Sequence, residues 1–256
     1  SQAMTAQQVI DAIHGSYATG SKHGLQNTQA LLDRLCPALA VPVIHVAGTN
    51  GKGSICAMLE SVLRHAGYRT GLYTSPFLQA YPERIRLNGV PIDDARLVRY
   101  GSALLRAAEG LQPTPFELGT ALALSAFEGE RVDVAVVEVG LGGRLDPTNV
   151  VRPTACAIAA IGLDHMHVLG DTLEQIAGEK AGIIKPGVPV VCHPAVPGVA
   201  RVFAERAADV GAPLRQLTRD LLLDGRCTAH GTTATYQLEN RWADMPIALP
   251  GEHQLT

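Results

Sequence analysis

Two almost uninterrupted apolar runs limit what this chain can fold into. They are VDVAVVEVG at 132–140 and TACAIAAIG at 154–162. A strand with one face in water alternates apolar and polar residues, whereas a strand covered on both faces is apolar throughout. The two runs therefore predict buried strands of a parallel sheet that has helices packed on its faces.

The rest of the chain alternates shorter strands with helices. Apolar residues at helical spacing predict the helices, and one of them, at 52–66, should turn Ile55, Met58, Leu59, Val62 and Leu63 inward. We predict strands at 43–46, 70–73, 132–140, 154–162 and 188–192, a hairpin at 84–92 around Asn88-Gly89, and helices at 9–13, 25–35, 52–66, 94–109, 116–128, 173–182 and 199–210. Short alternating pieces at 218–248 predict a β-meander. The expected fold is α/β, a doubly wound, mainly parallel sheet with a P-loop and a small β-meander near its C-terminal end.

Composition removes several classes of function. The 256 residues are 46% hydrophobic, enough for a large core, and the formal net charge of -3 disfavours a nucleic-acid partner. No apolar stretch is long enough to span a membrane, and no signal peptide is expected. The five cysteines are scattered without a CxxC pair, which favours reduced thiols in the cytoplasm. We expect a cytoplasmic monomer that acts on small molecules.

A glycine-rich loop follows the first predicted strand, in the sequence IHVAGTNGKGS at 44–54. Backbone N–H groups of such a loop, together with a helix N-terminus, form a cradle for phosphate, and Lys52 would reach the terminal phosphates. The spacing Gly-x-x-Gly-Lys-Gly-Ser departs from GxxxxGK[ST]. The alternative is an ordinary glycine turn with a surface lysine.

Three other predicted strands also end in residues that could bind a phosphate or a metal. Ser75 follows the strand at 70–73, Glu138 ends the run at 132–140, and His165 follows Asp164 after the run at 154–162. Ligands of parallel sheets bind at the carboxyl ends of the strands, so these residues should gather at one edge. Glu138 is a candidate Mg²⁺ ligand, and the alternative for it is a salt bridge to Arg144 or Lys180.

Lys180 lies on the inward stripe of its predicted helix, four residues after Ile176. Burial disfavours the charged amine, and a neutral amine can act as a nucleophile, for example toward CO₂. An ordinary buried ion pair with Glu138 or Glu179 explains the same spacing equally well.

Long motifs of this sequence resemble the dihydrofolate synthase/folylpolyglutamate synthases, relatives of the Mur-type peptidoglycan ligases. The resemblance rests on HVAGTNGKGS, YTSPFL…ERIRLNG, PTPFELGTALAL, VVEVGLGGRLDPTNV, IGLDHMHVLGDTLEQIAGEKAGIIKPG and GEHQLT, and it runs from about residue 20 to the last residue. It implies an ATP-dependent ligase that adds L-glutamate to 7,8-dihydropteroate and to folate polyglutamate tails through an acyl phosphate. The alternatives are a folylpolyglutamate synthase only, or a P-loop nucleotide-binding module without ligase activity.

The resemblance also implies roles for individual residues. Catalytic roles fall on Lys52, Glu138, His165 and Lys180, and Lys180 matches the position of an N6-carboxylated lysine. Two Mg²⁺ ions would be held with the help of Ser75, Glu138 and His165. ATP would be bound by Thr49, Asn50, Gly51, Lys52, Gly53 and Ser54. The dihydropteroate or folate pocket would be formed by Gly20, Ser21, Lys22, His23, Thr114, Pro115, Phe116, Glu117, Leu145, Asp146 and Pro147.

The chain departs from the family pattern in two residues near this pocket and in length. Phe77 stands where many relatives have histidine, and Pro147 where alanine is common. By the resemblance, residues 1–256 correspond to the ATP-binding domain, at about 5–248, and end at the boundary to a C-terminal glutamate ligase domain. We therefore expect the 256-residue chain alone to bind nucleotide weakly and not to turn over.

Overall fold

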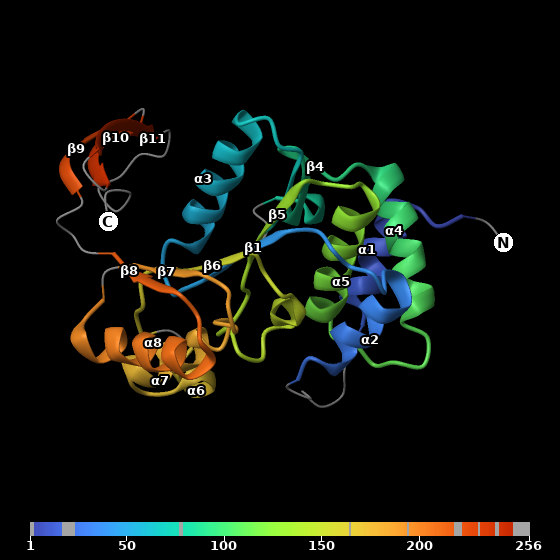
Figure 1. The fold of residues 1–256 in the computed structure, drawn as a ribbon. Coiled ribbons are helices and arrows are strands. Elements are labelled where there is room, and N and C mark those ends of the chain that lie inside the picture. The colour runs from blue at the N-terminus through green and yellow to red at the C-terminus, as the bar shows by residue number, and fades with distance from the viewer. Residues whose placement is uncertain are drawn as a thin grey trace.

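The computed structural model describes residues 3–16, 24–76, 79–163, 165–193, 195–217, 222–229, 231–238 and 241–247. Its main feature is an eight-stranded sheet with the order β4-β3-β2-β5-β1-β6-β7-β8 (Figure 1). The six strands from β2 to β8 in this order are parallel, and the β3–β4 hairpin adds two antiparallel strands at one edge. The strands are β1 Val43–Ala47, β2 Thr70–Tyr73, β3 Ile85–Leu87, β4 Val90–Pro91, β5 Val134–Glu138, β6 Ala155–Ile158, β7 Val190–Cys192 and β8 Leu214–Gln216. The predicted α/β fold with a mainly parallel sheet is confirmed.

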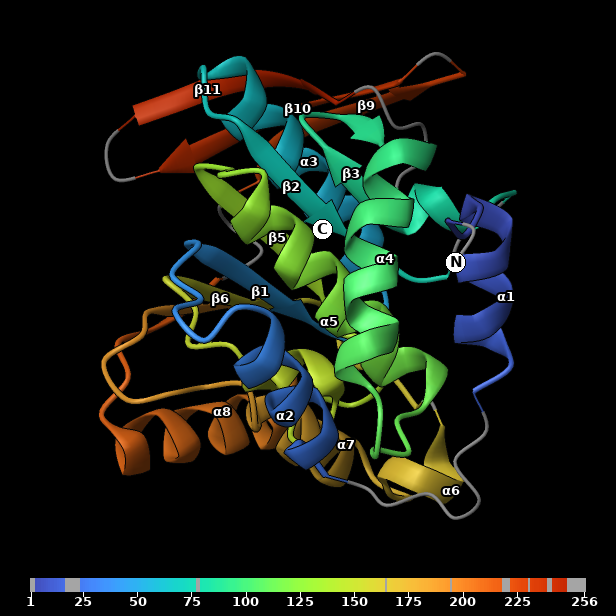
Figure 2. The same cartoon turned by 90° about the vertical axis from the view of Figure 1, so that its right-hand side faces the viewer.

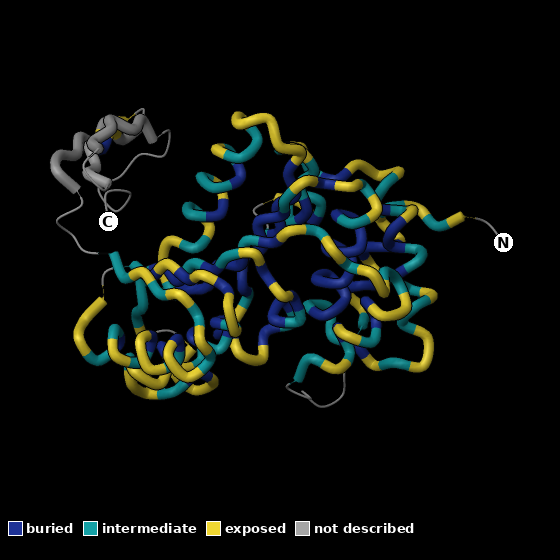
Figure 3. The backbone as a smooth tube through the Cα atoms, in the orientation of Figure 1, coloured by how far each residue is buried: buried dark blue, intermediate teal, exposed yellow. Residues whose placement is uncertain are grey.

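Helices cover both faces of the sheet (Figures 1 and 2). They are α1 Ala6–His14, α2 Gln26–Leu35, α3 Lys52–His65, α4 Asp94–Ala107, α5 Pro115–Gly129, α6 Met166–Leu169, α7 Leu173–Ala181 and α8 Pro197–Val210, with 3₁₀ turns η1 Tyr81–Arg84 and η2 Pro147–Val150. One face packs under α5 at one end and under α7 and α8 at the other, and α3 covers the opposite face. Buried residues concentrate around α5, in which residues 117–127 are all buried (Figure 3).

The predicted meander is a separate antiparallel sheet with the order β11-β10-β9. Its strands are β9 Leu222–Thr228, β10 Gly231–Leu238 and β11 Arg241–Ile247. The hairpin at Asn88-Gly89 is also confirmed, because both residues have positive φ, 51° and 81°, and connect β3 to β4. No helix among the described residues is long and apolar enough to cross a membrane.

The inward face predicted for α3 is partly wrong. Val62 is 67% exposed, whereas Cys56 and Glu60 are the buried residues of this helix. Glu60 is stable in this position because the Thr70 hydroxyl and the Arg64 Nε both donate to its Oε1, at 2.7 and 2.9 Å. A partner in β2 and another one turn later in α3 therefore stabilise the buried acid, and apolar spacing alone does not reveal them.

Candidate functional site

Four neighbouring parallel strands bring the predicted polar residues to one edge of the sheet. In the order β2-β5-β1-β6, their carboxyl ends lead to Ser75, Glu138, the glycine loop at 48–54 and His165. His165 is exposed and directly precedes α6, with a positive φ of 45°. The sheet topology therefore places these four segments on the same side of the molecule.

The glycine loop is fixed against the end of β6. The backbone N–H groups of Thr49 and Asn50 both donate to Ala160 O, at 2.9 and 3.2 Å, and the Thr49 hydroxyl donates to Gly162 O at 3.0 Å. These two amides are therefore occupied within the protein. The amides left to face a phosphate are those at the start of α3, where the N-cap Gly51 has φ 84° and no side chain caps the helix.

Glu138 lies directly beside this loop. It is 5% exposed, and a methyl group built on Gly53 would lie 3.8 Å from its Oε1. The Ser75 N–H donates to Glu138 Oε2 at 2.9 Å. Burial raises the pKa of Glu138, while the Ser75 N–H and the nearby charge of Lys52 act in the opposite direction. Ser75, Glu138 and Lys52 therefore form one cluster.

The donor set of this cluster suits Mg²⁺ bound together with a nucleotide. The described residues contain no group of three or more His, Cys, Asp or Glu side chains that could hold a metal by themselves. Mg²⁺ commonly takes one or two protein oxygen ligands and completes its shell with phosphate oxygens and water. A single buried carboxylate beside a helix N-terminus fits that pattern.

Lys180 is buried in α7, with an exposed fraction of 2%, and its Nζ donates to Gly48 O at 3.2 Å. The inward position expected from its spacing is therefore observed. Glu179, the neighbouring acid, forms an ion pair with Arg144 at 3.1 Å. Lys180 thus connects α7 to the glycine loop.

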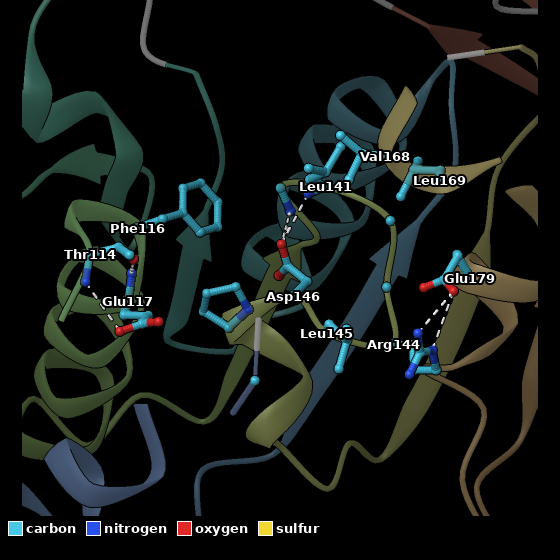
Figure 4. A pocket seen from close by; sticks show the side chains of 15 residues that line it. Thr114, Phe116, Glu117, Leu141, Arg144, Leu145, Asp146, Val168, Leu169 and Glu179 are labelled. Atoms are coloured by element: carbon cyan, nitrogen blue, oxygen red, sulfur yellow. Dashed lines mark hydrogen bonds and ion pairs between the residues drawn. The ribbon is translucent and has the colours of Figure 1, made fainter. Parts of the chain in front are cut away.

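A cavity of about 540 Å³ is lined by residues 140–147, which follow Glu138 in the chain, and by residues of α5, α6 and α7 (Figure 4). Phe116 and Glu117 of α5 face it from one side, and Leu141, Leu145 and the α6 residues Val168 and Leu169 face it from others. Of the residues predicted for a pteroate pocket, Thr114, Phe116, Glu117, Leu145, Asp146 and Pro147 line the cavity, and Pro115 begins α5. Gly20, Ser21, Lys22 and His23 lie outside the described residues.

The segment 140–147 contributes eight consecutive residues to the cavity wall. Gly140 and Gly143 allow close packing of this segment. A methyl group on Gly140 would lie 2.0 Å from Phe116 Cζ, and one on Gly143 would lie 2.8 Å from Glu179 O. The segment therefore packs tightly between α5 and α7. The glycines in the sequence did not by themselves predict this packing.

Asp146, near the end of this segment, is buried and accepts four hydrogen bonds. Its Oδ1 accepts from the N–H groups of Gly140 and Leu141, at 3.1 and 3.0 Å, and its Oδ2 accepts from the N–H group of Thr148 at 3.0 Å and from the Thr148 hydroxyl. Burial raises the pKa of Asp146, and these four donors counteract the shift. The carboxylate therefore fixes the shape of the cavity wall.

His45 of β1 extends this network on the far side of Thr148. Its Nε2 lies 2.8 Å from Thr148 Oγ1, and the histidine is fully buried. Because the Thr148 hydroxyl donates to Asp146, its oxygen accepts from His45, which assigns the proton to Nε2. Burial, with a smaller contribution from the charge of Lys185, lowers the pKa of His45 to about 3. Sequence reasoning missed this residue, since a lone histidine inside a strand carries no motif.

The fold and this site define an α/β protein with a glycine loop and a buried carboxylate, Glu138, at one sheet edge, followed in the chain by the wall of a largely apolar cavity. The family model of the Mur ligase middle domain matches residues 46–192, which is more than half of the chain. The chain therefore belongs to the Mur ligase family, and the matched residues are its middle domain.

Individual relatives narrow the comparison. The chain is 40% identical over 252 residues to the dihydrofolate synthase/folylpolyglutamate synthase of Bacillus subtilis, covering 94% of this chain and 59% of that protein. It is 41% identical over 221 residues to the folylpolyglutamate synthase of Lacticaseibacillus casei, covering 82% of this chain and 51% of that protein. The chain thus spans between half and three fifths of these two relatives.

Solved structures show the same likeness. A structure named as an FPGS-AMPPCP-folate complex superposes with a TM-score of 0.94 at 36% identity, covering 98% of this chain and 64% of that chain. Escherichia coli FolC in complex with DHPP and ADP gives a TM-score of 0.81 at 33% identity, covering 93% of this chain and 57% of that chain. The fold is therefore shared over nearly the whole chain.

The buried His45 predicts how stability depends on pH. The folded protein holds this histidine neutral with a pKa of about 3, whereas an unfolded histidine has a pKa near 6.5. The unfolded state therefore binds the extra proton first, and stability present above pH 6.5 is lost as the pH falls toward 3. Between pH 6.5 and 4.5 the wild type should lose about 1.4 kcal/mol per pH unit more than the variant His45→Gln. Urea unfolding of both proteins measures this difference, and parallel curves would contradict the prediction.

The close packing of Gly143 predicts a second effect. A methyl group there would lie 2.8 Å from Glu179 O and 2.9 Å from Lys180 O, and both are backbone atoms of α7 that cannot move aside easily. Gly143→Ala should lower the free energy of unfolding by about 1–3 kcal/mol. The control is Gly178→Ala, also near this part of α7, where nothing lies within 4 Å and the change should stabilise by up to about 1 kcal/mol. Equal effects of the two changes in urea unfolding would refute the packing argument.

Proposed function

We propose that this chain forms the nucleotide-binding part of an ATP-dependent carboxylate–amine ligase that adds L-glutamate to 7,8-dihydropteroate and to folate polyglutamate tails. The observation that supports this best is the short chain connection between two sites, since Glu138 ends β5 and the cavity wall begins two residues later at Gly140. The glycine loop and Glu138 lie at the same sheet edge as the 540 Å³ cavity. A phosphate donor bound at the loop and a carboxylate acceptor bound in the cavity would lie at the same edge of the sheet.

The relatives favour the same reaction class. Those most like this chain include the bifunctional protein of B. subtilis and the folylpolyglutamate synthase of L. casei, and solved neighbours bear the ligand names AMPPCP, folate, DHPP and ADP. Because the chain spans only part of these proteins, the activity of the whole is a proposal for this one. The identities of 40% and 41% do not separate a bifunctional enzyme from a folylpolyglutamate synthase.

The reaction proceeds in two balanced steps. An oxygen of the substrate carboxylate attacks the γ-phosphorus of ATP, the bond to the β,γ-bridging oxygen breaks, and ADP leaves. The amine of L-glutamate then attacks the acyl phosphate carbon and loses a proton, and phosphate leaves with formation of the amide. The first step develops negative charge on the transferring phosphoryl group and the second on the departing phosphate, and a positioned cation stabilises both.

Different residues of the chain would bind the phosphates, hold the metal and anchor the glycine loop. Lys52 would neutralise charge on the terminal phosphates, and the first amides of α3 would hold them. Ser75, Glu138 and His165 would hold Mg²⁺, which supplies Lewis-acid stabilisation of phosphoryl oxygens when bound. Thr49 and Asn50 would act by anchoring the loop to Ala160 O. Lys180, if N6-carboxylated, would present a carboxylate in place of the amine that now donates to Gly48 O.

The cavity suits the flat, aromatic acid that the resemblance to dihydrofolate and folylpolyglutamate synthases implies. Its wall is largely apolar, and Phe116 provides an aromatic face opposite the segment that carries Leu141 (Figure 4). Arg144 is the one basic side chain among the residues that line the described cavity, and Glu179 is its partner. We propose this cavity as the dihydropteroate or folate site.

The proposed chemistry predicts a loss of activity on changing the phosphate-side residues. ADP formation by the complete gene product is measured with ATP, Mg²⁺ and L-glutamate, with either dihydropteroate or a reduced folate as the acid. Lys52→Met and Glu138→Gln should each reduce the rate by about 10²–10³-fold, because each removes one stabilising charge from the transferring group.

The control for this assay is Arg201→Met, which removes an exposed ion pair with Glu205 in α8 and should leave the rate unchanged. Activity with the folate but none with dihydropteroate would indicate a folylpolyglutamate synthase alone. Nucleotide binding without acid- and glutamate-dependent ADP formation would indicate a nucleotide-binding module and reject the ligase proposal.

A further inference from the structure

The wall of the cavity is held from outside by two side chains that do not line it. The connection from β5 to β6 supplies residues 140–147 to the cavity and continues through Thr148 and Asn149 in η2. His45 reaches Thr148, and Lys185, which follows α7, reaches Asn149. Two consecutive residues of the connection are thus bound by side chains from two distant parts of the chain.

The first contact acts on Asp146. The two oxygens of this carboxylate accept from four donors, which fills the four lone-pair positions available to a carboxylate. Thr148 contributes two of these donors, and His45 fixes the rotation of its hydroxyl by donating to the same oxygen at 2.8 Å. The orientation of Asp146, and through it the amides of Gly140 and Leu141, therefore depends on a histidine in β1.

The second contact acts on the middle of the segment. Lys185 Nζ donates to Asn149 Oδ1 at 2.6 Å, which orients the amide so that its Nδ2 donates to Arg144 O at 3.0 Å and Gly182 O at 3.2 Å. Burial lowers the pKa of Lys185 to about 8. A half-buried lysine is costly to retain for packing alone, and its hydrogen bond is charge-assisted. This contact attaches the cavity wall to the end of α7.

We propose that His45 and Lys185 are positioning residues of the acid-substrate cavity, which hold its 140–149 wall in the binding conformation without touching the ligand. This inference rests on the proposed function for the identity of the ligand. It assigns the two residues a role in binding dihydropteroate or folate and none in binding ATP.

Hydrogen exchange measured by mass spectrometry tests the positioning without any ligand. In the 256-residue chain, Lys185→Met and His45→Ala should increase exchange of the 139–149 peptide at least tenfold, while peptides from α5 stay unchanged. Lys185→Arg and His45→Gln keep an N–H donor and should restore protection. Arg201→Met, which removes an exposed cation, is the matched control. Unchanged exchange at 139–149, or an equal increase over the whole chain, overturns the proposal.

Binding measurements on the complete gene product test the functional part. Lys185→Met should weaken 7,8-dihydropteroate binding at least tenfold and change the affinity for a non-hydrolysable ATP analogue less than threefold, and Lys185→Arg should recover most of the loss. Faster exchange with unchanged dihydropteroate affinity would overturn the proposed role in binding. If the wild type binds no dihydropteroate, the proposed function fails, and the exchange result still decides whether the two residues hold the segment.

Discussion

The contact between the glycine loop and the end of β6 determines where α3 begins relative to Glu138. Gly48 has φ 145°, and a methyl group there would lie 2.5 Å from Ala159 Cβ, so only glycine allows the two strand ends to approach this closely. Hydrogen bonds to Ala160 O hold the loop on one side, and Lys180 Nζ holds Gly48 O from α7. With the loop in this place, α3 starts beside Glu138, and a helix N-terminus and a buried carboxylate come to share one small volume.

Much of the fold could be predicted because its signals are local. Continuous apolar runs marked the buried strands β5 and β6, and Asn88-Gly89 marked the hairpin. The elements that were missed are short or depend on distant partners. They are α6, with four residues, β8, a three-residue edge strand, and the 3₁₀ turns, of which η2 begins at the Asp146 cap. Periodicity needs a longer window than these segments offer.

Part of the candidate site could also be predicted, in this case from the sheet topology. Glu138, Ser75 and the glycine loop could be placed together because parallel strands deliver their following residues to one edge. What the spacing could not show is which hydrogen-bonding groups are already used. The family resemblance predicts that Asp146 contacts the substrate. In the structure its carboxylate oxygens already accept hydrogen bonds from Gly140, Leu141 and Thr148. The amides of Thr49 and Asn50 are likewise engaged with Ala160 O.

A single stretch of backbone joins the two halves of the site. Glu138 ends β5, the cavity wall begins two residues later at Gly140, and Thr148 and Asn149 end the stretch under His45 and Lys185. Glu138 is therefore separated from the cavity wall by a single residue, Val139. Polar groups that are fully hydrogen-bonded in a buried position resist rearrangement, because each broken contact leaves an unsatisfied donor or acceptor. The network around Asp146 thus holds the cavity wall in place beside the end of β5, and the proposed phosphoryl transfer would depend on the spacing between Glu138 and that wall.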